Sequence, residues 1–233
     1  MFGVFVNVIT VIIGSCIGLL FKKGSPEKVS HAAMTGLGAC TLFIGIKGSL
    51  CGENVLILIA SVVLGVITGT LLDIDGSINR LAKKVEAKFQ SPRQKVSLAE
   101  GLVTATLLFC VGSMTVTGSI QAGLTGDNTV LLTKATLDLV SSMMLSANLG
   151  FGVLLAAGSV LFLQGGIVLF AGFLAPVMSM GAINEMTCAG SLLIIMIGTN
   201  MMGMTKLKVA DFLPAILYAP VLYHVIMLVK EYI

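Results

Sequence analysis

Charged residues are scarce in this sequence: Lys, Arg, Asp and Glu make up 11% of the 233 residues, against about 25% in an ordinary soluble domain. Tryptophan is absent, aromatic residues reach 6%, and one short linker carries the only basic cluster, so nucleic-acid binding is not expected. Hydrophobic residues supply 56% of the chain, and the mean hydropathy is +1.04. Too few polar side chains remain to cover a surface in water, so the composition predicts that lipid is the solvent.

The residues that most enzyme sites need are also missing. His31 and His224 are the only histidines, which excludes a His-rich metal site. No nucleophile elbow, P-loop or dinucleotide motif stands between a strand and a helix. The cysteines form no C-x-x-C pair, which favours packing over metal or redox roles: Cys16, Cys40, Cys51, Cys110 and Cys188. We therefore expect no enzyme activity, metal or cofactor; an intramembrane protease is a distant alternative that lacks a partner constellation.

Long apolar runs indicate how the chain crosses the bilayer. A helix needs about 20 apolar residues to span a hydrocarbon core of about 30 Å. The run at 149–175, the sixth in the chain, is long for one crossing and is interrupted by Gln164-Gly165-Gly166. It is a tilted helix, a kinked helix or two half-helices. The first run lacks a basic n-region and is interpreted as a retained span. The sequence thus predicts an all-α integral membrane protein, a single transmembrane domain over 1–233, with about eight helices: 2–21, 32–50, 55–72, 101–118, 129–147, 149–175, 187–204 and 212–229.

Basic residues orient this bundle. They concentrate after the first, third and seventh runs: Lys22, Lys23, Lys28, Arg80, Lys83, Lys84, Lys88, Arg93, Lys95, Lys206 and Lys208. The positive-inside rule makes that face cytoplasmic, so both termini are expected outside a bacterial inner membrane. If the sixth run is a re-entrant hairpin instead, Lys206 and Lys208 move outside; the single crossing is preferred.

The linker 73–100 is the only substantial stretch between the runs that is not apolar. Ile78, Leu81, Val85 and Phe89 share one helical face and basic residues cover the other, a pattern typical of a helix on an anionic membrane surface. A solvated connector explains the pattern equally well.

An internal repeat is also predicted. Residues 25–30 return with one insertion as 91–97, which defines repeat units at 25–75 and 91–150. A fainter third unit covers 183–229. Gly45, Gly112 and Gly198 stand at corresponding depths, where glycine allows close packing or a hinge. The first two units run parallel, and under the eight-span topology the third would be inverted. Repeats related by inversion are common in secondary transporters.

Two charges inside the fifth run are the first candidates for a site. A charge near the bilayer centre costs about 2.5–3.5 kcal/mol on insertion scales. Lys134 and Asp138 are four residues apart, so they share a helical face and can pair. The pair is either structural or an ion-coupling site, in which Asp138 is the better candidate to bind a cation or proton.

Polar residues alternate with apolar ones after the fourth run: Ser113, Thr115, Thr117, Ser119 and Gln121. An extended segment would place them on one side, and such a segment at membrane depth must line a cavity or be buried in protein. We expect this stretch to line a pathway; the alternative is a helix end whose hydroxyls bond to the preceding turn. Gln164 with Gly165 and Gly166, Glu185, and Asn200 are further isolated candidates.

These residues also carry a family resemblance. The stretch from Leu107 to Asp127, Lys134 with Asp138, Gln164-Gly165-Gly166, and the segments 183–187 and 197–200 resemble a bacterial inner-membrane family of unassigned function, the YdfK and YqgA type. Members of that family often have proline where this chain has Ser113. The resemblance covers nearly the whole chain and implies a multi-pass topology without naming a substrate.

Two functions are therefore compatible with the sequence. The first is a secondary transporter or channel for a small polar solute or ion, built from the candidate residues above. The second is a membrane scaffold or sensor that recruits partners through the basic linker. Glycine-rich faces are compatible with a homodimer.

Overall fold

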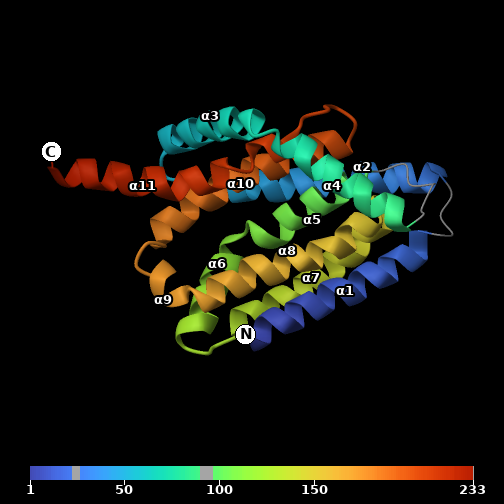
Figure 1. Ribbon diagram of the computed structural model, residues 1–233, viewed down its shortest axis with the longest axis horizontal. Helices are drawn as coiled ribbons and strands as arrows, with labels where there is room; N and C mark the ends of the chain where they lie inside the picture. Colours follow the sequence, from blue (N-terminus) through green and yellow to red (C-terminus); the bar gives the residue numbers. More distant parts are fainter. Residues whose placement is uncertain (23–26, 90–96, 233) are drawn as a thin grey trace.

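A computed structural model describes residues 1–22, 27–89 and 97–232, and these residues form helices without any strand (Figure 1). Several helix starts follow from the sequence, because Asn54, Ser97 and Ser179 each accept a hydrogen bond from a backbone N–H of the first turn. The elements are α1 (Phe2–Lys22), α2 (Glu27–Ser49), α3 (Val55–Leu71), α4 (Ile74–Phe89), α5 (Leu98–Cys110), α6 (Ser113–Leu124), α7 (Thr129–Leu149), α8 (Phe151–Leu169), α9 (Ala171–Leu174), α10 (Met180–Met201), the 3-10 helix η1 (Val209–Phe212) and α11 (Ala215–Tyr232).

The helices have the length and apolar surface of membrane spans. In the described ranges, five are long and apolar enough to cross a bilayer: α1, α7, α8, α10 and the segment Val209–Val229. The number rises to seven if each of two bent pairs, α3 with α4 and α5 with α6, is one span. Large apolar side chains such as Phe162 and Phe173 are 82% exposed, as expected on a lipid-facing surface. The predicted all-α multi-pass membrane fold is therefore confirmed, while the number eight stays a prediction.

The bundle has two groups of helices with a broken helix between them. In one group α1 packs along α7 and α8; in the other α2 packs along α10, and α3 and α11 lie beside it (Figure 1). The pair α5–α6 contacts α8 on one side and α10 on the other. Any site inside the first group is therefore walled by α1, α7, α8 and the pair α5–α6.

Small residues bring the paired helices close together. Gly14 and Gly18 of α1 lie against the backbone carbonyls of Leu139 and Met143 on α7. On the α2–α10 seam, a Cβ at Gly198 would be 2.8 Å from Leu42 N, and one at Gly45 would be 2.7 Å from Ile195 N. Glycine at these positions allows the helix backbones to approach closely.

The broken helix is present, but not where the sequence indicated. α8 runs unbroken through Gln164, Gly165 and Gly166, so the hypothesis of two half-helices or a re-entrant hairpin there is wrong. The break lies at Val111–Gly112, where the axes of α5 and α6 differ by 60°. The interpretation of 113–121 as an extended segment is also wrong, because these residues form the first turns of α6.

Within the linker 73–100, residues Ile74–Phe89 form α4, which is only partly a surface helix. Ala82 is buried with Leu98 and Ala99, and Ile78 packs against the same cluster, so part of the apolar face covers the bundle rather than lipid. Leu81 is 60% exposed. Residues 90–96, the side chains of Val85 and Phe89, and part of both predicted repeat motifs (25–26 and 91–96) lie outside the described residues. The internal repeats remain a prediction.

Candidate functional site

The two charges predicted on one face of α7 form a buried ion pair. Lys134 Nζ contacts Asp138 Oδ2, and the two residues are 6% and 5% exposed. Asp138 lies about nine residues into the helix, or about 14 Å at a rise of about 1.5 Å per residue. That depth is close to the middle of a bilayer core of about 30 Å. Such a pair is costly to bury unless further hydrogen bonds support it.

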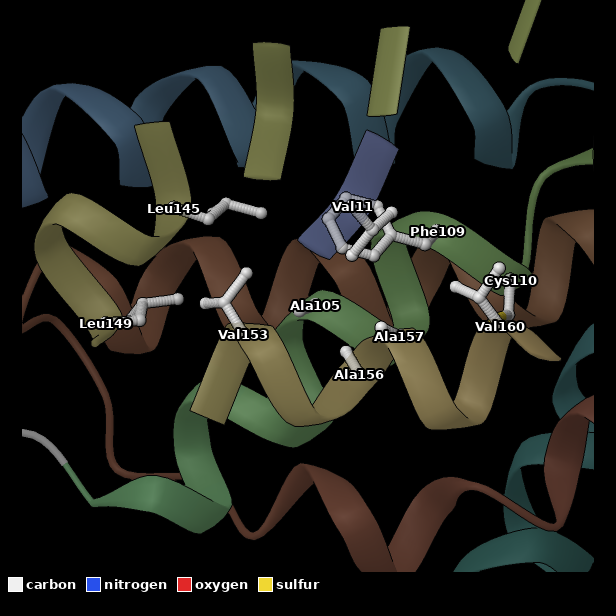
Figure 2. Packing of buried hydrophobic residues seen from close by; sticks show 10 residues of the cluster. All are labelled: Val11, Ala105, Phe109, Cys110, Leu145, Leu149, Val153, Ala156, Ala157 and Val160. Carbon is white, nitrogen blue, oxygen red and sulfur yellow. The ribbon is translucent and has the colours of Figure 1, made fainter. Parts of the chain in front are cut away.

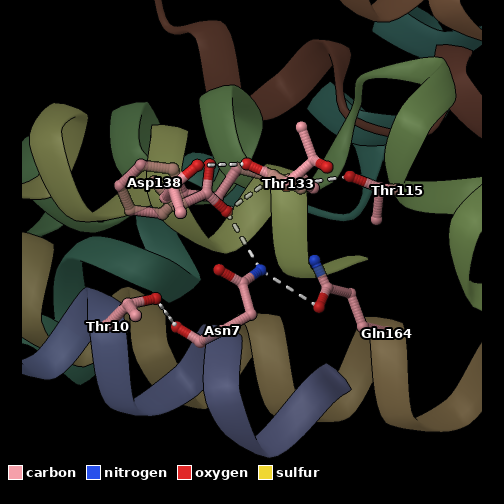
Figure 3. A network of polar contacts seen from close by, with 9 residues as sticks. Asn7, Thr10, Thr115, Thr133, Asp138 and Gln164 are labelled. Atoms are coloured by element: carbon pink, nitrogen blue, oxygen red, sulfur yellow. Dashed lines mark hydrogen bonds and ion pairs between the residues drawn. The ribbon is translucent and has the colours of Figure 1, made fainter. Parts of the chain in front are cut away.

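Asn7 of α1 supplies this support and links three helices (Figure 3). Its Nδ2 lies 3.0 Å from Asp138 Oδ2 and 3.1 Å from Gln164 Oε1 on α8. Asn7 and Gln164 are both fully buried. Sequence reasoning missed Asn7, although a lone amide within the apolar first run was a signal of the same kind as Gln164.

The break between α5 and α6 lies beside the pair. The Thr115 hydroxyl donates a hydrogen bond of 3.0 Å to the carbonyl of Phe109, an acceptor that lies before the interruption. The ring of the same Phe109 has its centroid 6.0 Å from Lys134 Nζ, at the outer limit of a cation–π contact. Ser119 lies one turn beyond Thr115 on α6 and is fully buried. Thr115 is thus linked through Phe109 to the cluster of Asn7, Lys134, Asp138 and Gln164. Ser119 Oγ has no hydrogen bond to that cluster.

Several buried polar side-chain atoms have no hydrogen-bond partner among the residues that the structure describes. Three of them belong to helices packed against α7: Asn7 Oδ1, Gln164 Nε2 and Ser119 Oγ. A buried polar atom without a partner costs about 1–3 kcal/mol. Asn7 and Gln164, which are bonded to each other beside Asp138, therefore leave one acceptor and one amide donor for a water, an ion or a polar solute.

Apolar residues close the site at both ends. Val4, Leu131 and Val168 form one buried cluster, each one helical turn from Asn7, Lys134 or Gln164. In the opposite direction along α1 and α8, Val11 and Val160 lie one turn away from Asn7 and Gln164, in the cluster that includes Phe109 (Figure 2). Along α1 and α8 the polar residues Asn7 and Gln164 thus lie between two apolar clusters.

Two other predicted site residues lie outside this cluster, and each stabilises another part of the fold by hydrogen bonds. Glu185, 2% exposed, accepts hydrogen bonds from Glu53 N at 2.8 Å and Asn54 N at 2.9 Å, and so caps the start of α3. The Asn200 side chain holds the loop after α10 through the backbone N–H and carbonyl of Leu207. Neither residue has a hydrogen bond to the cluster.

The remaining residues of the predicted pathway are likewise separate from the pair. Thr117 donates to the carbonyl of Ser113 at 2.9 Å, a bond within α6, and Gln121 donates to Asp127 at 2.8 Å beyond the end of the helix. Gly112 begins α6 with an ordinary φ of −65° and open space around it. Gly165 and Gly166 lie within α8 without close backbone contact.

A separate cavity of about 440 Å³ lies on the α10 side of α5. Its lining comes from α4, α5, the end of α10 and the loop that follows, and includes Thr104, Asn200, Lys206 and Lys208. The cluster around Asp138 contributes no residue to it. Within the described residues, no group of three or more His, Cys, Asp or Glu could hold a metal ion.

Comparisons with known proteins place the chain among membrane proteins. Residues 2–224 match the family described as "Protein of unknown function (DUF554)". The chain is 35% identical over 230 residues to "Uncharacterized membrane protein YdfK" of Bacillus subtilis (strain 168), covering 97% of each chain. It is 26% identical over 220 residues to "Uncharacterized protein YqgA" of Escherichia coli (strain K12), covering 93% of this chain and 94% of that protein. No solved structure matches the chain.

Proposed function

Because the chain belongs to the DUF554 family, whose description assigns no activity, we propose a function from the site itself: a secondary transporter or channel that moves a small polar solute or ion across the membrane. The bacterial inner membrane, with both termini outside, is part of this proposal. The protein would carry out no chemical conversion of the solute.

One observation carries the proposal: the ion pair of Lys134 and Asp138 is buried near the middle of α7, a helix long and apolar enough to cross a bilayer, and lies beside the broken helix α5–α6. Interrupted helices expose backbone groups at the centre of the bilayer, and transporters use such breaks to bind substrates and coupling ions. Ionisable residues inside a membrane are rare and mark ion or substrate routes.

Unpaired atoms argue against a purely structural pair. A pair retained only to hold helices together gains most when every polar atom around it is paired. Here Asn7 Oδ1 and Gln164 Nε2 are buried without partners among the described residues. The apolar clusters on either side would act as the two gates of an alternating-access cycle.

Flux measurements on the purified chain in proteoliposomes test the proposal. A panel of radiolabelled ions and small neutral solutes should reveal at least one that is taken up faster than by protein-free liposomes. Asp138→Asn should abolish this uptake, while the control Asp73→Asn, at the exposed pair with Arg80, should leave it unchanged. Uptake that is the same in Asp138→Asn and the wild type would exclude the cluster as the route.

The scaffold hypothesis predicts the opposite dependence. A protein that recruits partners through the linker should tolerate Asp138→Asn and lose its partner when the charges of Lys83 and Lys84, which are exposed on α4, are reversed. The same two variants, compared in flux and in co-purification, therefore separate the two functions.

A further inference from the structure

The cavity on the α10 side of α5 has the features of a second binding site, separate from the cluster around Asp138. Its volume is about 440 Å³, within the range of about 300–1,000 Å³ that small-molecule pockets cover. We infer that it binds a small zwitterion, a molecule that carries both an ammonium group and an acidic group and has no net charge. The inference goes beyond transport, because binding in this cavity does not require a route through the cluster.

The cavity is built from segments that meet at one end of the bundle. α4 contacts both α5 and η1, and the loop between α10 and η1 supplies a further wall (Figure 1). Asp211 of η1, 6% exposed, accepts a hydrogen bond of 3.0 Å from the backbone N–H of Asp75, and so fixes the start of α4 against η1. The buried residues Val209 and Ala210 line the cavity between them. The walls are therefore held together by contacts within the fold itself.

Hydrogen bonds also fix the loop that carries the basic side of the cavity. Asn200 Oδ1 accepts from the Thr205 hydroxyl at 2.7 Å and from Leu207 N at 2.9 Å, and Asn200 Nδ2 donates to Leu207 O at 2.8 Å. The backbone that carries Lys206 and Lys208 is thereby held beside the cavity. A site that is ordered before its ligand arrives loses less conformational entropy on binding.

Charged residues of both signs line the cavity without forming ion pairs with one another. Lys206 and Lys208 come from the loop, and Asp75 and Glu100 come from the first turns of α4 and α5. Asp75 accepts a hydrogen bond of 2.9 Å from Asn79 Nδ2. Within the described ranges, no side-chain hydrogen bond or ion pair is made by Lys206, Lys208 or Glu100. Positive and negative groups are therefore both available to a ligand.

This balance of charge indicates the kind of ligand. Two lysines and two carboxylates make the cavity neutral overall. A simple anion would meet the carboxylates as well as the lysines, and a simple cation would meet the lysines as well as the carboxylates, so each would gain one attraction and suffer one repulsion. A zwitterion pairs its acidic group with the lysines and its ammonium group with the carboxylates. Free amino acids and the phosphoethanolamine headgroup of a lipid share this chemistry.

Isothermal titration calorimetry on the purified full chain in detergent tests the inference. The zwitterionic probes are glycine, alanine, glutamine and glycerophosphoethanolamine; acetate, inorganic phosphate and ethylammonium are comparators that carry one sign of charge. We expect at least one zwitterion to bind about tenfold or more tightly than every comparator, because it forms a second charged pair. Binding of an amino acid assigns a free solute to the cavity, whereas binding of glycerophosphoethanolamine alone assigns a lipid headgroup.

Substitutions in the cavity should change which charge is preferred, an effect that a folding defect does not produce. Glu100→Gln leaves a net positive charge, so it should weaken zwitterion binding about tenfold and strengthen acetate binding. Lys206→Gln leaves a net negative charge, so it should weaken the zwitterion to a similar extent and strengthen ethylammonium binding. The controls Glu53→Gln and Lys47→Gln, at exposed residues outside the cavity, should change neither affinity nor preference.

The inference is overturned if no zwitterion of the panel binds more tightly than the comparators. It is also overturned if Glu100→Gln and Lys206→Gln both keep the affinity and the preference of the wild type. Zwitterion binding without flux of any solute would support this site and defeat the transport function, whereas flux through the Asp138 cluster without zwitterion binding would do the reverse.

Discussion

Asn7 and Asp138 are 131 residues apart in the sequence, yet the Asn7 amide nitrogen lies 3.0 Å from an Asp138 carboxylate oxygen. The same nitrogen donates to Gln164 on α8. Asn7 is therefore the residue that joins α1, α7 and α8 at the depth of the ion pair. A second donor on Asp138 also shares the negative charge that Lys134 otherwise balances alone.

We expect Asn7→Leu to destabilise the protein by about 1–3 kcal/mol, because it leaves Gln164 Oε1 without its donor and removes one from Asp138. Unfolding in detergent, followed by circular dichroism, measures the change. The matched control is Asn148→Leu, which removes an amide whose bond within the described part of the chain goes to a carbonyl of its own helix, Met144 O, and it should have little effect. Equal losses in the two variants would show that the Asn7 bonds add nothing to stability.

The ion pair of Lys134 and Asp138 should show strong energetic coupling. Removing one partner of a buried pair leaves an uncompensated charge and typically costs about 3–5 kcal/mol, whereas removing both is often much less costly. We therefore expect Lys134→Met and Asp138→Leu each to be more destabilising than the double variant. A double-mutant cycle on unfolding free energies measures the coupling, and additive losses would mean that the two side chains do not interact.

The sequence predicted the parts of the site that depend on local spacing. Lys134 and Asp138 had to share a face because residues four apart do so in any helix, and their insertion cost required a partner. The membrane class followed in the same way from composition. Asn7 lay in the first apolar run, where nothing local showed that it would face Asp138.

Positions that depend on tertiary contacts could not be predicted. Gln164-Gly165-Gly166 carries the stronger local signal for a break, yet α8 passes through it, since glycine without steric demand is tolerated in a packed membrane helix. The break at Gly112 is stabilised by Thr115, whose hydroxyl satisfies the Phe109 carbonyl. Glu185 caps α3 across more than a hundred residues, a partnership that spacing does not reveal.

Replacing a glycine by alanine should destabilise the protein where α2 packs against α10, but not within α8. Gly198→Ala places a methyl group 2.8 Å from Leu42 N and 2.9 Å from Gly38 O, so the two helices must separate, and we expect a loss of about 1–3 kcal/mol, as in other overpacked interiors. Gly166→Ala is the matched control, because no atom lies within 4 Å of its added Cβ. That change should be neutral or stabilising by about 0.5–1 kcal/mol through helix propensity. Thermal unfolding of both variants in detergent measures the difference; a similar loss in each would show that the seam is not close-packed in the native protein.

The loop between α6 and α7 should loosen as the pH falls. The Thr129 hydroxyl and backbone N–H donate to Asp127, and these bonds hold the pKa of its carboxyl below the usual range. A carboxyl whose folded-state pKa is depressed stabilises the structure above its unfolded pKa, and this contribution is lost as the pH falls through the folded value. Neighbouring Asn128 accepts a hydrogen bond of 2.9 Å from Gly3 N, so the loop also anchors the start of α1.

Hydrogen exchange at the Thr129 amide, corrected for intrinsic rates, should therefore accelerate below the usual Asp pKa of about 3.9. Asp127→Asn should exchange faster than the wild type already at neutral pH and show a weaker pH response. Protection that is independent of pH in the wild type would mean that the Asp127 carboxylate does not hold the loop.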